Sequence, residues 1–223
     1  MTQLAQLEAL TNPAKAAELL ACHKAPRRYL GISSPDIEAL VAEWRAALSV
    51  NDRVALAANL WDSDIHEARI AAAKLLTQAR LRPDDSAWHL IQSWVPGFDT
   101  AALADPASIA GQKRLTADPD RLDTVEPWIA SPHMWTRRAA LMMTLPWTKQ
   151  NHPKPEEEAA RDRILGWCAS LAPDRDWNIQ SAIAGWLRDL SKHDAPRARA
   201  FLAAHGETLK PFAQKEAARH LAD

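Results

Sequence analysis

The spacing of apolar residues is that of α-helices along almost the whole chain. After the start signal Ser34-Pro35-Asp36, apolar side chains recur at intervals typical of one helix face: Ile37, Leu40, Val41, Trp44 and Leu48. No credible alternation of apolar and polar residues runs longer than four residues, so a β-sheet is not expected. The pattern predicts an all-α protein.

Further helices are predicted along the rest of the chain. Two more apolar stripes cover residues 54–60 and 65–76, and later helices are expected at 83–93, 119–130, 133–145, 155–171, 176–192, 195–205 and 209–222. Prolines stand near the start of many of them, where a missing N–H costs least. Helices of about 10–18 residues joined by short turns indicate antiparallel pairs.

A weak repeat links these helices. A polar residue, a spacer and an alanine recur as Arg69-x-Ala71, Arg138-x-Ala140, Gln180-x-Ala182 and Lys215-x-Ala217. The last two intervals are 42 and 35 residues, and the first, 69, is about two such units. Periods of this size favour a HEAT-like helical-repeat solenoid, an α-α superhelix, over an irregular helical bundle. We predict one HEAT-like repeat domain spanning residues 1–223.

Composition limits the classes of function. Hydrophobic residues make up 47% and charged residues 25%, as in a globular chain, and only 6 glycines argue against glycine-rich phosphate loops. The net charge of −1 argues slightly against nucleic acid unless charge is segregated onto one face. Most of the 10 tryptophans are expected in the core, with a few left as stacking surfaces.

Several features of other protein classes do not occur in the sequence. Cys22 and Cys168 form no Cys-x-x-Cys motif, and two free buried thiols in a reducing cytoplasm are favoured over a disulfide. Neither a signal peptide nor a run of 18 apolar residues is present, so we expect a cytoplasmic protein away from the membrane. The eight histidines show no metal-binding spacing, and we expect no metal.

Residues 94–111 are the least helical stretch. Pro96, Gly97 and Pro106 interrupt the rhythm there. A break in an otherwise regular array is a natural place for a functional site.

Four segments, in this order and spacing, resemble one known family. They are PRRYLGI at 26–32, LWDSDIHEARIAAAKLL at 60–76, WTRRAAL at 135–141, and IQSAIAGWLRDLSK at 179–192 followed by Ala195-Pro196 and the closing helix. From about residue 20 to the end, the chain resembles the AlkD-like DNA alkylation repair family of HEAT-like repeat DNA glycosylases.

The resemblance implies a specific chemistry. Such proteins bind double-stranded DNA along a concave face and hydrolyse the N-glycosidic bond of cationic N3- and N7-alkylpurines, without a cofactor and without moving the base into a pocket. The family uses one carboxylate beside two tryptophans, with an arginine nearby. A carboxylate stabilises positive charge that develops on the sugar, and tryptophan faces attract cations. A monomer is expected.

Carried over residue by residue, the family pattern Trp-x-x-x-Asp favours Asp105 as the catalytic carboxylate. The tryptophan position is then Ala101, which departs from the family. A second register places Phe98 in the aromatic position and leaves Asp99 as the acid. Asp105 before Pro106 is also explained as a helix N-cap followed by a first-turn proline.

The other family positions fall in two later segments. Arg138 matches the family's arginine and is assigned with Asp105 to catalysis, while its plainer explanation is a repeat-linking arginine, like Arg69. The second tryptophan position is Gly185, and Trp186 follows one residue later, rotated by about 100° around a helix, which also suits a core residue. Arg137 is rotated by a similar angle from Arg138 and is expected to be solvated.

A set of residues along the chain is expected to contact DNA. Tyr29 matches the aromatic residue of the first segment, although a half-buried turn aromatic explains it equally. The expected DNA-binding residues are Tyr29, Arg28, Trp135, Arg137, Trp186, Arg188 and Lys192. A wider basic track adds Lys24, Arg27, Lys113, Arg114 and Lys149, with ordinary solvated faces as the alternative.

Three functions remain open from the sequence. The first is an alkylpurine-DNA glycosylase. The second is a catalytically inactive relative that recognises damaged or branched DNA, suggested by the changed tryptophan positions at Ala101 and Gly185. The third is a protein-interaction scaffold, which is a common use of such repeats and suits a near-zero net charge.

Overall fold

The computed structural model describes residues 1–221 and divides them into two compact units, residues 1–117 and 118 onward. Within the described residues every regular element is an α-helix or a short 3₁₀ helix, apart from one isolated bridge between Arg28 and Ile65. The predicted all-α helical-repeat class is confirmed. That residues 1–223 act as one domain stays a prediction.

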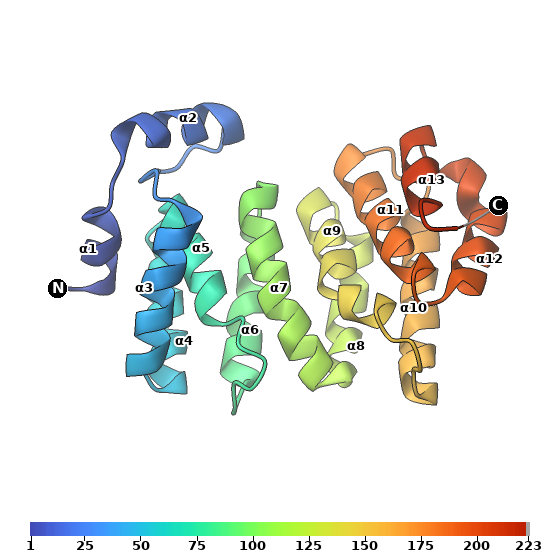
Figure 1. The fold of residues 1–223 in the computed structure, drawn as a ribbon, viewed down its shortest axis with the longest axis horizontal. Helices are drawn as coiled ribbons and strands as arrows, with labels where there is room; N and C mark the ends of the chain where they lie inside the picture. The colour runs from blue at the N-terminus through green and yellow to red at the C-terminus, as the bar shows by residue number, and fades with distance from the viewer. Residues whose placement is uncertain (222–223) are drawn as a thin grey trace. The chain divides into compact units, whose positions relative to one another are not determined.

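The first unit is built from stacked helices that follow two N-terminal helices. Its elements are α1 (Gln3–Glu8), α2 (Pro13–His23), α3 (Ser34–Ala47), α4 (Val50–Asp62), α5 (His66–Leu75), α6 (Asp85–Trp94), η1 (Val95–Gly97) and α7 (Ala101–Ala117). Helix α5 packs against α3, α4 and α7, while α6 packs against α4 and α7. Helix α2 runs across the end of α3 rather than along it (Figure 1).

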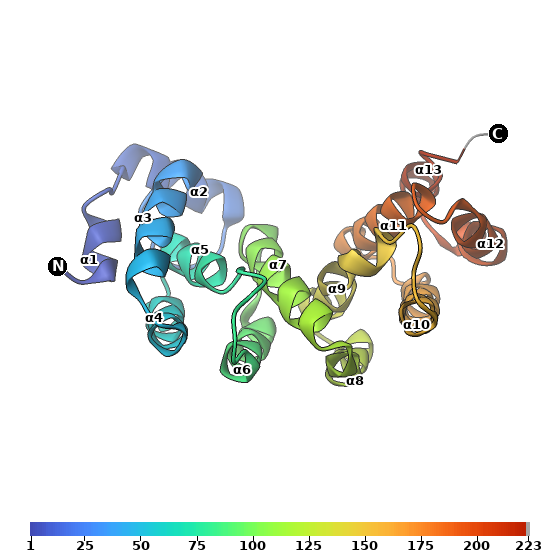
Figure 2. The same cartoon turned by 60° about the horizontal axis from the view of Figure 1, so that its bottom comes forward.

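The second unit is also built from stacked helices, and several short helical elements connect them. Its elements are η2 (Pro119–Arg121), α8 (Leu122–Val125), η3 (Glu126–Ala130), α9 (Met134–Met143), η4 (Leu145–Thr148), α10 (Pro155–Leu171), α11 (Trp177–Ser191), α12 (Ala195–His205), η5 (Gly206–Thr208) and α13 (Pro211–Ala217). Helix α11 lies between α9 and α13, with α12 packed on it, as Figure 2 shows within this unit.

Local sequence explains where these helices begin and which face they bury. Helix α3 starts after Ser33, whose side chain accepts from the Asp36 amide, and it buries Ile37, Val41 and Trp44 at helical spacing. The repeat alanines Ala71, Ala140, Ala182 and Ala217 are all buried in α5, α9, α11 and α13. Small side chains at these positions let neighbouring helices pack closely.

Two expectations about secondary structure were wrong. Residues 101–111 are not irregular but form the first part of α7, with Pro106 inside the helix. Packing of α7 against α5 and α6, together with the helix-favouring alanines around Pro106, offsets the cost of an internal proline, about 3 kcal/mol. Residues 119–130 do not form one helix but break into η2, the short α8 and η3, because Pro127, inside the predicted helix, lacks an amide donor.

Other boundaries differ more modestly. Helices α10 and α12 have the predicted bounds, whereas α1 and α2 were not predicted. Helix α13 ends at Ala217, short of the predicted end at residue 222, which lies outside the described residues. Within the described part of the chain, no helix is both long and apolar enough to cross a membrane.

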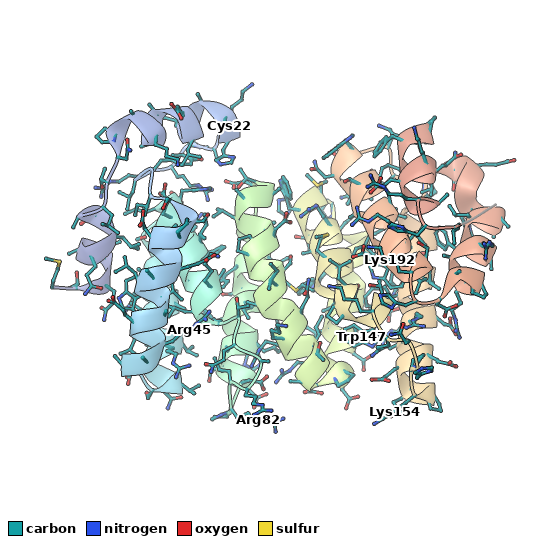
Figure 3. All side chains as sticks on the ribbon, viewed as in Figure 1. Cys22, Arg45, Arg82, Trp147, Lys154 and Lys192 are labelled. Atoms are coloured by element: carbon teal, nitrogen blue, oxygen red, sulfur yellow. The ribbon has the colours of Figure 1, made fainter. Side chains whose placement is uncertain are left out.

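The tryptophans and cysteines are placed largely as expected. Seven tryptophans are buried, led by Trp94 and Trp186, and Trp177 is exposed. Both cysteines are free, as predicted. Cys168 is buried, but Cys22, on α2 in Figure 3, is exposed, which corrects the expectation of two buried thiols. It is exposed because no residue of α2 is buried.

Candidate active site and nucleic-acid interface

Asp105 lies on α7 in the first unit, where it lines two adjoining cavities. One, of about 470 Å³, is bounded by α2, α3, α5 and α7. The other, of about 530 Å³, is lined by α3, α5 and α7. Asp105 is half-buried and lies in the body of the helix, so it is not the N-cap that its sequence position before Pro106 suggested.

The alternative acid, Asp99, is engaged elsewhere. Its carboxylate accepts from the guanidinium of Arg27, whose side chain is only 5% exposed and also lies 3.9 Å from Asp64. This ion pair ties the segment before α7 to the loop that joins α2 to α3. Of the two acids, Asp105 is the one that lines the cavities, and its assignment over Asp99 stays a prediction.

Cations near Asp105 have acidic or carbonyl partners. Lys74 lines both cavities, and its Nζ lies 2.7 Å from the carboxylate of Glu38. Arg45, labelled on α3 in Figure 3, lines the larger cavity and donates to the backbone carbonyl of Lys74. The positive charge around the carboxylate is therefore partly balanced.

A buried glutamate shapes the wall of the smaller cavity. The Glu67 carboxylate is 1% exposed and accepts from the Leu30 amide at 2.8 Å and the Gly31 amide at 2.7 Å. Gly31 has a φ of +73°, and a Cβ there would lie 2.3 Å from the carbonyl oxygen of Asn12. The Glu67 bonds and the glycine thus fix the loop that joins α2 to α3.

Beside Glu67, His66 is the buried member of a three-ring cluster. Its ring centroid lies 4.9 Å from that of His23 and 4.7 Å from that of Tyr29. Burial, together with repulsion from His23, Arg27 and Arg69, lowers the pKa of His66 to about 4. The imidazole is therefore neutral at pH 7.

Tyr29 belongs to this cluster and not to an open surface. It is 8% exposed, its hydroxyl donates to the Ala25 carbonyl at 3.3 Å, and burial is the main cause that raises its pKa. The packing of the Tyr29 ring on His66 fits the alternative of a turn aromatic, and its contact with DNA stays a prediction. Neighbouring Arg28 is exposed and pairs with Glu8 at 2.6 Å.

In the second unit, Arg138 and Gly185 meet at one cavity of about 190 Å³. The same cavity is lined by Ser181, Arg188 and Asp189. The Arg138 guanidinium carbon lies 5.6 Å from the ring centroid of half-buried Trp135. A Cβ added at Gly185 would meet nothing within 4 Å, so this family tryptophan position is open space.

Trp186 is not available for DNA contact. Its side chain is fully buried. The shift of one residue from Gly185 turns the tryptophan into the core of the unit, as a rotation of about 100° requires. The expectation that Trp186 binds DNA is therefore wrong, and the core alternative is correct.

Several of the predicted DNA-binding cations have acidic partners. Arg137 pairs with Asp174 at 2.8 Å and donates to the carbonyls of Ser131 and Pro132, so it is a brace and not a solvated side chain. Arg188 pairs with Glu216 at 2.6 Å and with Asp189, and Lys192 lies 3.8 Å from Asp189 at the end of α11 (Figure 3).

Arg114, from the wider basic track, is fully buried. It pairs with Asp84 at 3.0 Å and donates to the carbonyls of Gln78, Ala79 and Leu81. It is therefore a structural arginine and cannot reach a phosphate in the folded protein.

An exposed aromatic pair was missed by the sequence analysis. Trp177 is 62% exposed and stacks on Phe212 at a centroid distance of 6.1 Å. Each residue stands three positions before a repeat position, Gln180 and Lys215, as Trp135 stands before Arg138. That shared offset is a signal that could have marked the pair.

In residues 1–221, no group of three or more His, Cys, Asp or Glu side chains is arranged so that it could hold a metal ion. The side chains at the cavities supply carboxylates, lysine and arginine cations, and imidazole rings, of which that of His66 is neutral.

The stacked helix pairs and their buried repeat alanines define an all-α helical-repeat protein. A model of one family, described as DNA alkylation repair enzyme, matches residues 3–221. The chain belongs to that family, which confirms the resemblance seen in the sequence.

Among solved structures, the chain is similar to a predicted DNA alkylation repair enzyme from Enterococcus faecalis. The two share 20% sequence identity and superpose with a TM-score of 0.79, over 96% of this chain and 97% of that chain. This likeness supports the fold. A comparison with curated proteins finds no match.

Proposed function

We propose that this protein is a monofunctional DNA glycosylase that hydrolyses the N-glycosidic bond of cationic N3- and N7-alkylpurines in duplex DNA. One observation carries the proposal: in a chain of the DNA alkylation repair family, Asp105 lines two adjoining cavities on α7. The proposal also includes double-stranded DNA as the partner, a monomeric state and a cytoplasmic location.

The carboxylate suits the chemistry. An alkylated purine carries positive charge and leaves readily, so the transition state concentrates charge on the deoxyribose. A carboxylate close to the sugar stabilises that charge and orients the attacking water. Arg138, with its guanidinium over Trp135, would hold a phosphate through its planar fork.

The test is release of 7-methylguanine and 3-methyladenine from methylated duplex DNA by the purified protein. Asp105→Asn should lower the release rate by about 10²–10³-fold, the size expected for removing one electrostatic stabiliser. Asp99→Asn is the matched control because its carboxylate pairs with Arg27. It should retain release once corrected for the folded fraction. Loss of release only in Asp99→Asn would identify Asp99 as the acid.

A second function is favoured by the two changed tryptophan positions. Ala101 places a methyl group and not an indole in the cavity beside Asp105, and Gly185 leaves open space near Arg138. These changes suit a relative that binds damaged or branched DNA without cleaving it. Wild-type protein that binds such DNA but releases no methylated base would establish this function in place of the first.

A further inference from the structure

Two aromatic side chains lie side by side on the surface of the second unit. Trp177, in the first turn of α11, is 62% exposed, and Phe212, in the first turn of α13, is 38% exposed. Their rings are nearly parallel, at 21°, and their centroids lie 6.1 Å apart. Within residues 1–221 these are the only exposed Trp, Tyr or Phe side chains. A large apolar ring left in water is unusual and offers its face to a planar ligand.

Hydrogen bonds hold the starts of the two helices together under these rings. The Arg175 guanidinium donates to the carbonyl of Thr208 at 3.1 Å. The fully buried side chain of Gln180 accepts from the Lys210 amide at 2.7 Å and donates to the carbonyl of Asp174 at 2.7 Å. Helices α11 and α13 also pack against each other (Figure 2). The two rings are therefore positioned before any ligand arrives, which lowers the entropy cost of binding.

Positive charge accompanies the rings. Arg175 and Lys210 each stand two positions before a ring, and Lys215 lies on the exposed side of α13. Among the described residues, none of these three cations forms an ion pair with a carboxylate, unlike most of the arginines described above. Two acids beside them are engaged, because Asp176 caps α11 and Glu216 pairs with two arginines. The surface therefore combines aromatic faces with cations that can take an anionic partner.

This combination suits unpaired nucleotides, whose bases stack on aromatic faces while their phosphates meet basic side chains. The faces of bases inside a duplex are covered by their neighbours and cannot use the rings. The core of a protein–protein interface is depleted of charge, so a protein partner fits less well. We propose that Trp177 and Phe212 form a stacking platform for unpaired bases of a single-stranded nucleic acid, with its phosphates on Arg175, Lys210 and Lys215. The inference goes beyond the proposed function, which concerns duplex DNA and Asp105, and it does not require base release.

Fluorescence anisotropy with labelled single strands of about 12 nucleotides tests the platform. Wild type should bind a DNA strand more tightly than an abasic strand of the same length, because the abasic strand keeps the phosphates but has no bases to stack. Trp177→Ala and Phe212→Ala should each weaken binding about 5- to 150-fold, as expected for the loss of one stacked base. Trp177→Phe keeps a ring and should retain most of the affinity. Leu20→Ala, which removes an exposed apolar side chain of α2, is the matched control and should bind like wild type.

The salt dependence tests the cations. Lys215→Gln should reduce the slope of log affinity against log salt by about 0.7, the value for one phosphate contact on a single strand. Arg219→Gln is the matched control, because Arg219 is exposed and already pairs with Glu216, and it should leave the slope unchanged. The same titration with an RNA strand shows which of the two nucleic acids binds more tightly. Thermal melts establish that each variant is folded.

Three results would overturn the platform: no binding of single strands by wild type, equal affinity for the base-bearing and abasic strands, or undiminished binding by the folded double variant Trp177→Ala/Phe212→Ala. Self-association of wild type that Trp177→Ala abolishes would identify a second copy of the chain as the occupant and would also overturn it. Base release from methylated duplex separates this inference from the glycosylase. Release without single-strand binding keeps the glycosylase and rejects the platform, whereas single-strand binding without release supports the platform and rejects the glycosylase.

Discussion

At the scale of single residues, two glycines should respond in opposite ways to substitution by alanine. Gly31 holds a φ of +73° against the backbone of Asn12 and Ala16, whereas Gly185 sits in α11 with open space around its missing Cβ. Gly31→Ala should destabilise the protein by more than about 3 kcal/mol, from left-handed strain plus the steric clash. Gly185→Ala should stabilise it by about 0.5–1 kcal/mol. Urea denaturation measures both, and equal effects would contradict the placement of Gly31.

His66 makes stability depend on pH. Its pKa is lowered to about 4 in the folded protein, so the unfolded chain binds more protons between about pH 4 and 6.5. Its contribution to stability is full above pH 6.5 and falls as the pH drops toward 4, by up to about 3 kcal/mol. His66→Phe should lose less stability than wild type between pH 7 and pH 4 in urea titrations. Parallel losses in the two proteins would argue against a buried neutral imidazole.

The order of the motifs pointed to Asp105, Arg138 and Gly185, which all line cavities in the structure, and their roles stay predictions. Sequence alone could not show that Asp99 pairs with Arg27 or that Arg137 braces Asp174, because those partners are 72 and 37 residues away. Trp186 illustrates the same limit. Trp186 is buried because it stands one residue after Gly185, and one residue turns a side chain by about 100° around the helix. An approximate alignment does not fix the register to a single residue, so it could not show which way the indole points.

At the scale of elements, buried arginines tie successive helices together. Arg161 of α10 is 1% exposed, donates to the carbonyls of Trp147 and Gln150, and pairs with Asp194, the N-cap of α12, at 2.9 Å. Its side chain therefore satisfies the end of one helix and the start of another.

Removing the Arg161 guanidinium should lower the stability of the protein more than removing the guanidinium of Arg197. Arg161→Met leaves buried carbonyls unpaired and should destabilise by about 3–5 kcal/mol. Arg197→Met is the control, because Arg197 is more exposed and also pairs with Asp194. It should cost about 1 kcal/mol or less. Thermal unfolding compares them, and a larger loss for Arg197→Met would refute the brace.

Helix boundaries were predictable where sequence signals agree and not where they conflict. Helices α10 and α12 have the predicted bounds because a proline near each start coincides with the onset of apolar periodicity. In α7 the signals disagree, since Pro106 indicates a start while the alanines on both sides favour helix. Packing of α7 on α5 and α6 decides the outcome, and one helix passes through the proline.

At the scale of the whole molecule, the repeat pattern predicted the class of fold because a polar residue, a spacer and a buried alanine recur in α5, α9, α11 and α13. The repeat pattern could not show which of the basic side chains are paired with carboxylates. Lysine and arginine side chains recur along the chain, yet Arg27, Arg28, Arg114, Arg137, Arg188 and Lys192 all lie against carboxylates. Internal pairing reduces the positive charge left for a phosphate backbone.

This pairing predicts a shallow salt dependence for DNA binding. With a net charge of −1 and many cations paired, we expect about 3–5 phosphate contacts, which gives a slope of log affinity against log salt between about −3 and −5. Arg138→Gln should reduce the slope by about 1, whereas Arg114→Gln should leave it unchanged in the folded fraction, because that guanidinium is buried. Fluorescence anisotropy on duplex DNA from 50 to 200 mM salt measures these slopes. A slope steeper than about −8 would mean that the ion pairs open on binding. No binding at any salt concentration would exclude duplex DNA as the partner and favour the protein-interaction scaffold.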